Sequence, residues 1–316
     1  MSQQPPQSPP RPSSEATPFD RSLLRRHRDR AAANFARHDF LVREAAERLS
    51  DRLDDVRRKF PLALDLGCHG GELAGILAGR GGIERLVQSD LSPAMAHLAA
   101  ANGSPALVAD EEFLPFAAAS FDLVLSCLSL HWVNDLPGTL LQIRQAMKPD
   151  GLFLGVLFGL DTLGGLRDCL IEAEAETKGG ASPRISPFAD ARDGAGLLQR
   201  AGFALPVADV ETIRVTYPDA LALMRDLRGM GEANANRARS DKYAGRELFA
   251  RAAALYAERH GEADGRVRAQ FRLLFLTGWA PHESQQQALR PGSAQKRLAH
   301  ALDAIEHKTS DKAPRQ

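Results

Sequence analysis

An apolar run that ends in an acid and opens at once into glycines constrains the fold of this chain more than any other segment. It reads LALDLGCHGGELA and begins at Leu62. The apolar residues predict a buried strand at 62–66, and residues 72–78 predict a helix. Glycines between the two let the backbone turn sharply and approach a ligand, while the first N–H groups of the helix stay free. The segment therefore predicts a strand, loop and helix that bind a ligand.

Short apolar runs and helical patterns alternate after this segment, which predicts βαβ units and a parallel sheet. The turn residues KPDG at 148–151 are expected to end a helix and to precede the next strand. The expected strands are 62–66, 85–89, 106–109, 121–127 and 152–158, and the helices between them are 72–78, 93–101 and 137–147.

The alternation loosens beyond Gly159, where helices become more frequent than strands. Two late strands are expected near 207–216 and 270–278, and such strands can pair antiparallel at a sheet edge. The insertion between them, at about 217–262, is expected to cover the open end of the sheet as a substrate lid. Further helices are expected at 162–177, before AGF at 201–203, at 219–230 and at 245–260. The fold class is α/β, with a mostly parallel seven-stranded sheet, an antiparallel edge strand and a helical insertion before the last strand.

The two ends of the chain differ from its middle. Residues 1–18 are rich in Pro, Ser and Gln and predict a disordered tail, and 285–316 form a polar tail in which 294–308 allows a short amphipathic helix. Residues 19–60 predict a helical extension with one apolar stripe from Phe35 to Phe60, and 61–284 predict one domain. The extension opens with five arginines and one aspartate over 21–30. Their commoner role is a solvated helix face, and the alternative is a patch that docks an acidic partner or helps to close a cofactor pocket.

The overall composition limits the possible partners and compartments. Lys plus Arg total 40 and Asp plus Glu total 40, so no net field draws the chain to nucleic acid or to an anionic membrane. The cysteines Cys68, Cys127 and Cys169 are far apart and odd in number, which fits neither a disulfide framework nor a zinc site. No stretch reaches the roughly 18 apolar residues of a membrane helix, and no signal-peptide pattern is present. These features predict a cytoplasmic protein without stable membrane insertion.

Three acids, Asp65, Asp90 and Asp110, stand at the ends of three successive predicted strands. The chain lacks the glycine patterns of dinucleotide and nucleoside-triphosphate sites, and an acid beside the loop would repel phosphates. A carboxylate at this place suits the ammonium and sulfonium of S-adenosylmethionine, and one at the second strand can hold ribose hydroxyls. Each acid alone is equally well explained as a helix cap or turn residue. Together with the glycine loop they predict a site for S-adenosylmethionine.

The loop resembles the first motif of the class I S-adenosylmethionine-dependent methyltransferases, D/E-x-G-x-G-x-G, with His69 in place of the middle glycine, where a side chain would crowd the methionine end of the cofactor. ADEEFLPF at Ala109 and FDLVLSCLSLHWV at Phe121 resemble further motifs of that fold. The resemblance implies a Rossmann-like fold. It implies that the cofactor is bound by Asp65, Gly67, Cys68, Gly71, Asp90, Leu91, Asp110, Glu111 and Ser126.

Longer phrases narrow the resemblance, among them FDRSLLRRHRDRAA at Phe19, LSLHWVNDLP at Leu128, GGASPRISPF at Gly179 and LMRDLRGMGEAN at Leu223. They are similar to the methyltransferase-like complex I assembly factor family. The resemblance implies hydroxylation of an arginine on an iron–sulfur subunit of NADH:ubiquinone oxidoreductase, a partner that would bring the chain to the periphery of the inner membrane. A more distant likeness is to the malonyl-acyl carrier protein O-methyltransferases.

Candidates for the substrate chemistry lie outside the glycine loop. His131 follows the fourth predicted strand and is a candidate proton acceptor, although packing under the next helix is an equally good explanation. Asp161 is a second catalytic candidate, because a carboxylate pairs with a guanidinium. Trp132, Arg167 and Arg184 are candidate substrate contacts, and the family resemblance alone adds Glu232. A helix cap or a surface ion pair is the commoner role for Asp161, Arg167 and Arg184. No His and acid spacing has the context of an iron or zinc site, so no metal is predicted. Methyl transfer to oxygen or nitrogen, and a cofactor-bound chaperone without catalysis, remain as alternatives.

Overall fold

The computed structural model describes residues 17–185 and 191–286, with the side chains of 191 and 192 left out. Backbone contacts divide the chain into two compact units, Met1–His282 and Glu283–Gln316. The first unit holds every helix and strand that follows. Residues 1–16 of the predicted N-terminal tail fall outside the described residues, and so does the predicted helix at 294–308.

A single seven-stranded sheet organises the first unit, in the order β3-β2-β1-β4-β5-β7-β6. The strands β1 to β5 run parallel to one another, whereas β7 runs antiparallel to both of its neighbours, β5 and β6. The expected mostly parallel sheet is thus confirmed, and the antiparallel strand lies one place in from the edge strand β6. The strands are β1 (Leu62–Leu66), β2 (Arg85–Asp90), β3 (Ala106–Val108), β4 (Phe121–Cys127), β5 (Met147–Phe158), β6 (Ala204–Tyr217) and β7 (Val267–Trp279).

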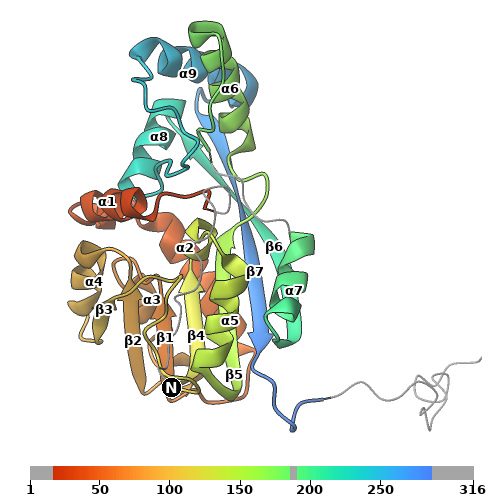
Figure 1. Ribbon diagram of the computed structural model, residues 1–316. Coiled ribbons are helices and arrows are strands. Elements are labelled where there is room, and N and C mark those ends of the chain that lie inside the picture. The colour runs from red at the N-terminus through yellow and green to blue at the C-terminus, as the bar shows by residue number, and fades with distance from the viewer. Residues whose placement is uncertain (1–16, 186–190, 287–316) are drawn as a thin grey trace, which may run out of the picture. The chain divides into compact units, whose positions relative to one another are not determined.

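Helices cover both faces of the sheet and extend beyond its carboxyl end (Figure 1). Strand residues alternate between two apolar clusters, because successive side chains of a strand point to opposite faces. Leu64 belongs to one cluster and Ala63 to the other. The helices are α1 (Arg21–Ala32), α2 (Phe40–Asp54), α3 (Glu72–Leu77), α4 (Pro93–Ala100), α5 (Leu136–Ala146), α6 (Gly164–Lys178), α7 (Ala191–Arg200), α8 (Ala220–Gly229) and α9 (Arg246–His260).

The insertion between β6 and β7 contains α8 and α9, as predicted from the loosened alternation. These two strands run past the others toward α8, α9 and α6 (Figure 1). Arginines of α9 tie the insertion to α6, because Arg251 pairs with Glu176 at 2.5 Å and Arg259 pairs with Glu172 at 2.8 Å. The insertion therefore lies next to α6 at the end of the sheet where parallel strands present their carboxyl termini.

The apolar stripe predicted from Phe35 to Phe60 does not lie on one helix. Phe35 lies in a short 3-10 turn, α2 begins only at Phe40, and Phe60 follows α2 outside any helix or strand. Both phenylalanines are buried, so the apolar residues of this segment reach the core from three local structures. The periodicity of apolar residues correctly predicted which side chains are buried, but it did not predict where the helix begins and ends.

The helix α5 ends at Ala146, just before the KPDG turn at 148–151, as predicted, but the turn lies inside β5, which starts at Met147, and does not precede it. Asp150 takes a left-handed conformation, with φ of 61°, and its carboxylate pairs with Arg58. The pairing register with β4 shifts between Phe121 and Leu123, so the turn is accommodated as an irregularity within the strand.

Candidate functional site

The glycine loop after β1 is held against the end of β2 by its own backbone. The N–H groups of Gly67 and Cys68 both donate to the carbonyl of Ser89, at 2.8 and 2.9 Å. Gly67 has a left-handed φ of 75°, and a Cβ there would lie 2.2 Å from the Cβ of Ser129. Only glycine fits both the backbone angle and this close approach.

Gly71, in contrast, serves helix packing. A Cβ at this position would lie 2.4 Å from Asn102 Nδ2, in the segment that follows α4, and the backbone φ is 87°. The amide of Asn102 also donates to the Gly71 carbonyl at 3.0 Å. Gly71, one of the predicted cofactor contacts, thus packs against the segment after α4 and holds the glycine loop to it.

His69 occupies the position where the methyltransferase motif has its middle glycine, and it adopts the left-handed φ of 49° that such a position requires. Its ring stacks on Phe35, with centroids 5.8 Å apart. Nε2 faces the carbonyls of Cys127 and Leu128 at 3.0 and 3.1 Å, so it carries the proton. Burial lowers the pKa of His69, and nearby Arg28 lowers it further. The neutral ring therefore connects the loop to the end of β4.

Asp65 is a fully buried carboxyl group to which no hydrogen-bond donor of the described residues points, at either oxygen. Burial raises its pKa well above the ordinary value, and the neighbouring carboxyls of Glu72 and Asp90 raise it further. Glu72 begins α3, and burial raises its pKa to about 7. In the part of the chain that the structure describes, Asp65 has no cation beside it and Glu72 is only partly compensated by Arg43, so a cation bound between the two acids would be stabilised.

Asp90, at the end of β2, is buried and anchored by the loops on either side. It accepts hydrogen bonds from the backbone N–H of His69 at 3.1 Å and of Ser92 at 2.8 Å. Its remaining acceptor positions face Arg28, whose Nη1 lies 3.4 and 3.3 Å from the two carboxylate oxygens. The carboxylate of Asp90 is therefore fixed by the glycine loop through His69 and is covered by the guanidinium of Arg28.

Glu111 lies beside Asp90 and is also fully buried. It accepts a hydrogen bond from Ser129 Oγ at 2.6 Å and pairs with Arg28 Nη1 at 3.4 Å and with Arg21. Burial alone would raise its pKa, but Arg21 and then Arg28 outweigh burial and hold the pKa at about 2. Glu111 is thus an ionised acid, and Arg21 also pairs with the predicted contact Asp110 at 2.7 Å.

The helix α1 brings both of these arginines to the acids, and it lies between α4 and α8 (Figure 1). Asp20 caps α1 by accepting from the N–H of Leu23 at 2.9 Å. Arg21 and Arg28 are seven residues apart and so face the same side of a helix. Arg25, Arg26 and Arg30 are exposed on the other sides. Three arginines of the run therefore form a solvated helix face, whereas Arg21 and Arg28 contact the acids of the predicted cofactor site.

The acids fit a cationic nucleoside cofactor. Both oxygens of Asp65 and one oxygen of Glu72 lack a hydrogen-bond partner among the described residues, Asp90 could hold hydroxyl groups, and the loop admits close approach at Gly67. The guanidinium of Arg28 takes the acceptor positions of Asp90 that ribose hydroxyls would need. These carboxylates supply the hydrogen-bond acceptors and the negative charge that such a cofactor needs, and α1 compensates part of that charge in this structure.

The remaining predicted cofactor contacts have structural partners. Ser126 Oγ donates to the Leu66 carbonyl at 2.7 Å and so connects β4 to β1. Cys68 is buried with its Sγ 3.7 Å from the His69 carbonyl, and burial raises the pKa of its thiol. Leu91 packs in a small cluster with Phe19, Leu24, Trp132 and Ala235, which joins the end of β2 to the N-terminal segment.

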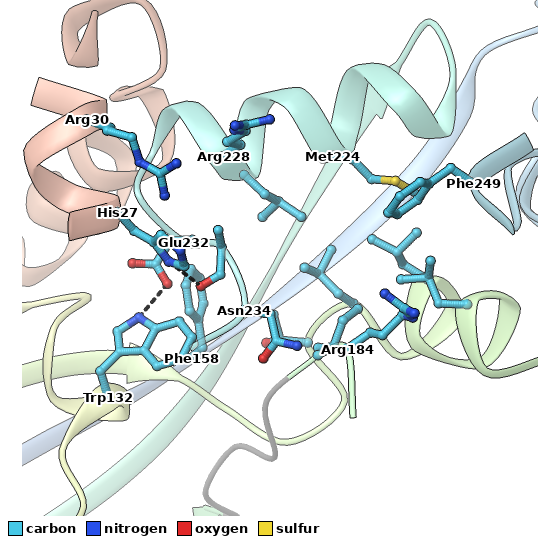
Figure 2. A pocket seen from close by; sticks show the side chains of 17 residues that line it. His27, Arg30, Trp132, Phe158, Arg184, Met224, Arg228, Glu232, Asn234 and Phe249 are labelled. Carbon is cyan, nitrogen blue, oxygen red and sulfur yellow. Dashed lines mark hydrogen bonds between the residues drawn. The ribbon is translucent and has the colours of Figure 1, made fainter. Parts of the chain in front are cut away.

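We call the glycine loop and its acids Asp65, Asp90 and Glu111 the cofactor cradle. A pocket of about 420 Å³ opens beside it, between α1, α6, α8 and α9 (Figure 2). Glu232 lies in it with a side chain only 8% exposed. Its Oε2 accepts from Trp132 Nε1 at 2.8 Å and lies 3.0 Å from His131 Nε2. Its Oε1 has no hydrogen-bond partner among the described residues. The pocket is thus lined by a carboxylate that is fixed through one oxygen and whose other oxygen is buried without a hydrogen-bond partner among the described residues.

The predicted substrate and catalytic residues are divided between two hollows. Trp132, Arg184 and Glu232 line the pocket of Figure 2, although Arg184 is paired with Glu174 at 2.5 Å. His131 lies behind Glu232, buried against the ring of Phe158 at 4.7 Å. Asp161 and Arg167 instead line a separate hollow of about 550 Å³, together with Arg259, His260 and Arg268.

Several residues of the site were not singled out by sequence reasoning. Arg28 and Ser129 contact the acids directly, and Arg30 and Arg228 lie on the rim of the pocket. The seven-residue spacing of Arg21 and Arg28 was a usable signal for an inward-facing pair. Among residues 17–185 and 191–286, no group of three or more His, Cys, Asp or Glu side chains is arranged to hold a metal. No helix in those ranges is long and apolar enough to cross a membrane.

Comparison with known proteins supports the fold and identifies relatives. Residues 64–155 match the family model described as a methyltransferase domain. The solved structure of YcgJ from Bacillus subtilis superposes with a TM-score of 0.53 at 12% identity, over 74% of this chain and 98% of that one. BH2331 from Bacillus halodurans gives 0.52 at 15% identity, over 75% and 99%. These likenesses show the fold.

Similarity in sequence extends over most of the chain. The arginine-hydroxylase NDUFAF5 of Danio rerio is 45% identical over 280 residues, covering 87% of this chain and 87% of the relative. The human protein of that name is 44% identical, covering 87% and 81%. A malonyl-[acyl-carrier protein] O-methyltransferase of Laribacter hongkongensis is 34% identical over 291 residues, covering 88% and 95%. The chain belongs to the NDUFAF5 arginine-hydroxylase family, within the class I methyltransferase superfamily.

Proposed function

We propose that this protein binds S-adenosylmethionine at the acids of the glycine loop and hydroxylates an arginine on an iron–sulfur subunit of NADH:ubiquinone oxidoreductase during complex I assembly. Membership of the NDUFAF5 family supports the reaction. The single observation that carries the proposal is the free Oε1 of Glu232, a buried carboxylate oxygen in a pocket beside the cofactor cradle.

Glu232 has the properties that recognition of a guanidinium requires. Although burial opposes ionisation, His131 and then Arg28 lower the pKa of Glu232, so the carboxylate is charged at neutral pH. Trp132 and His131 hold one oxygen and leave the other for a donor. A guanidinium binds such a carboxylate through its fixed fork of N–H groups.

The aromatic walls of the pocket fit the same ligand. Trp132 and Phe158 lie next to Glu232 in Figure 2 and line the pocket with it. Arginine side chains stack on aromatic faces, and their apolar stems pack on hydrophobic surface. The leucines and Met224 supply that surface along the rest of the pocket. The guanidinium of a substrate arginine would thus bind Glu232, and its apolar stem would pack against the leucines and Met224.

Arg28 interacts electrostatically with acids of both the cofactor cradle and the pocket. Its guanidinium is attracted by Asp90 and Glu111 on the cradle side and by Glu232 on the pocket side. A bound S-adenosylmethionine supplies positive charge at its sulfonium and ammonium groups. Hydroxylation also requires an oxidant as co-substrate, so we assign to the residues of this chain the binding and orientation of the two ligands.

The test compares the iron–sulfur subunit from strains with and without this gene by mass spectrometry. The proposal predicts an arginine heavier by about 16 Da, the mass of one oxygen atom, only where the gene is present. An arginine that keeps the added mass in the deletion strain would contradict the assigned reaction.

Methyl transfer is the second candidate, favoured by the 34% identity to an O-methyltransferase over almost its whole length. It predicts an added mass of about 14 Da and release of S-adenosylhomocysteine when the purified protein meets its substrate. Hydroxylation predicts no stoichiometric release of that product.

A further inference from the structure

A second hollow of about 420 Å³ continues the substrate pocket along the groove between α1 and α8. The two hollows share His27, Arg30, Arg228 and Ala233, and the second adds Arg225 and His38. Figure 2 shows Arg30 and Arg228 on the same side of the pocket, one from α1 and one from α8. A ligand that fills both hollows would therefore contact these two arginines. We call Arg30, Arg225 and Arg228 the arginine rim.

The charge of the arginine rim is largely uncompensated within the described residues. No carboxylate lies within 4 Å of the Arg30 or Arg228 guanidinium in that part of the chain, and Arg225 is 4.0 Å from Asp219. The nearby carboxylate of Asp226 is already bound by His38 at 2.6 Å and by the hydroxyl of Tyr217 at 2.9 Å. The rim therefore presents exposed positive charge with little local neutralisation.

His27 adds shape to the groove but no charge. Its Nδ1 donates to the carbonyl of Ala233 at 3.2 Å, which fixes the loop after α8 to α1. Burial lowers its pKa, and Arg30 lowers it further, so the ring is neutral near pH 7. The positive charge of the groove thus comes from its arginines.

This arrangement is unfavourable for an isolated arginine, because the rim repels the guanidinium that Glu232 would bind. The conflict disappears when the arginine is carried by a chain whose neighbouring residues are acidic. Carboxylates on either side of the arginine would pair with the rim while the guanidinium passes to Glu232. Complementary charge at a rim selects among partners and steers their approach.

We propose that the groove between α1 and α8 recognises acidic residues next to the substrate arginine, so that the protein selects an arginine in an acidic peptide segment. The inference rests on the proposed function for the role of Glu232. Recognition of the flanking acids is a separate property of the arginine rim and can be measured separately.

The experiment measures binding of fluorescent peptides to the full-length protein with S-adenosylmethionine present. The first peptide has a central arginine with aspartates on both sides, the second has asparagines in their place, and the third keeps the aspartates but replaces arginine by the neutral isostere citrulline. The proteins are the wild type, Arg30→Gln, Arg228→Gln and the control Arg200→Gln, which alters an exposed arginine of α7.

The aspartate peptide should bind the wild type about tenfold more tightly than the asparagine peptide, and salt should reduce the difference. Each rim variant should weaken binding of the aspartate peptide by about three- to tenfold, while Arg200→Gln leaves it unchanged. Neither rim variant should weaken binding of the asparagine peptide.

Equal binding of the aspartate and asparagine peptides, or equal losses in the rim variants and in Arg200→Gln, would overturn the role of the rim. The citrulline peptide tests the proposed function independently. If it binds as tightly as the arginine peptide while the rim variants still lose affinity for acidic flanks, recognition of the guanidinium by Glu232 is wrong and the rim assignment stands.

Discussion

Arg28 of α1 donates through Nη1 to both carboxylate oxygens of Asp90, at 3.4 and 3.3 Å, and both side chains are completely buried. A helix from outside the sheet thus reaches into the ligand-binding end of the fold and compensates its acids. The relationship makes α1 part of the site, and it determines how the site responds to mutation and to cofactor.

Replacing Arg28 by methionine should destabilise the protein. The substitution keeps much of the side-chain volume but leaves Asp90 and Glu111 without their shared counter-charge. Removing one partner of a buried ion pair costs about 3 to 5 kcal/mol, which urea denaturation would detect. Arg25→Met, on an exposed side of the same helix, should change stability by less than about 0.5 kcal/mol. Equal stability of the two variants would show that Arg28 is not needed by the acids.

Cofactor binding should loosen or shift α1. Because Arg28 occupies the outer acceptor positions of Asp90, hydroxyl groups that bind there must displace it. Amide hydrogen exchange with and without S-adenosylmethionine should therefore change across α1, while α5, which does not contact the acids, serves as the internal control. Saturation of the site without any change in α1 would contradict this displacement.

The apo protein should lose stability as pH rises from about 4.5 to about 7. The folded-state pKa of Glu72 is raised by burial from 4.5 to about 7, so ionisation of this acid favours the unfolded state. Glu72→Gln should therefore raise the free energy of unfolding at pH 8 by about 2 to 3 kcal/mol and leave it almost unchanged at pH 4. Denaturation curves of wild type and variant that stay parallel across this range would contradict the assigned shift.

The two glycines Gly67 and Gly75 should respond in opposite ways to alanine. At Gly67 the left-handed backbone and the contact with Ser129 oppose a methyl group, and the expected loss is about 2 to 5 kcal/mol. Gly75 lies within α3 with open space around it, so alanine there should add about 0.5 to 1 kcal/mol. Thermal denaturation distinguishes these results. A Gly67→Ala protein as stable as the wild type would show that Ser129 does not close on the loop.

The sequence predicted the sheet well because its signals are local. The apolar runs that form β1 and β4 were located to the residue, and the acids at strand ends follow from the strands themselves. The KPDG segment was misplaced because its turn residues form an irregularity inside β5, enclosed by Met147 and Leu152, which both pair with β4. Local propensity does not report such tertiary pairing.

The site was only partly predictable for a related reason. Asp90 was found from its position, but its partner Arg28 is 62 residues away in sequence, and arginines on a helix are usually solvated. Glu232 was named by family resemblance. The contacts that fix its Oε2 come from Trp132 and His131, about a hundred residues earlier, and no pattern within either segment indicates them.

The most direct test of the account is mass spectrometry of the iron–sulfur subunit from a deletion strain that carries either the wild-type gene or Glu232→Gln. Glutamine keeps the size of the side chain and a hydrogen bond to Trp132, but it removes the charge that would hold a guanidinium. With equal amounts of the two proteins, the account predicts an arginine heavier by about 16 Da with the wild type and an unmodified arginine with the variant. Full modification by the Glu232→Gln protein would contradict it.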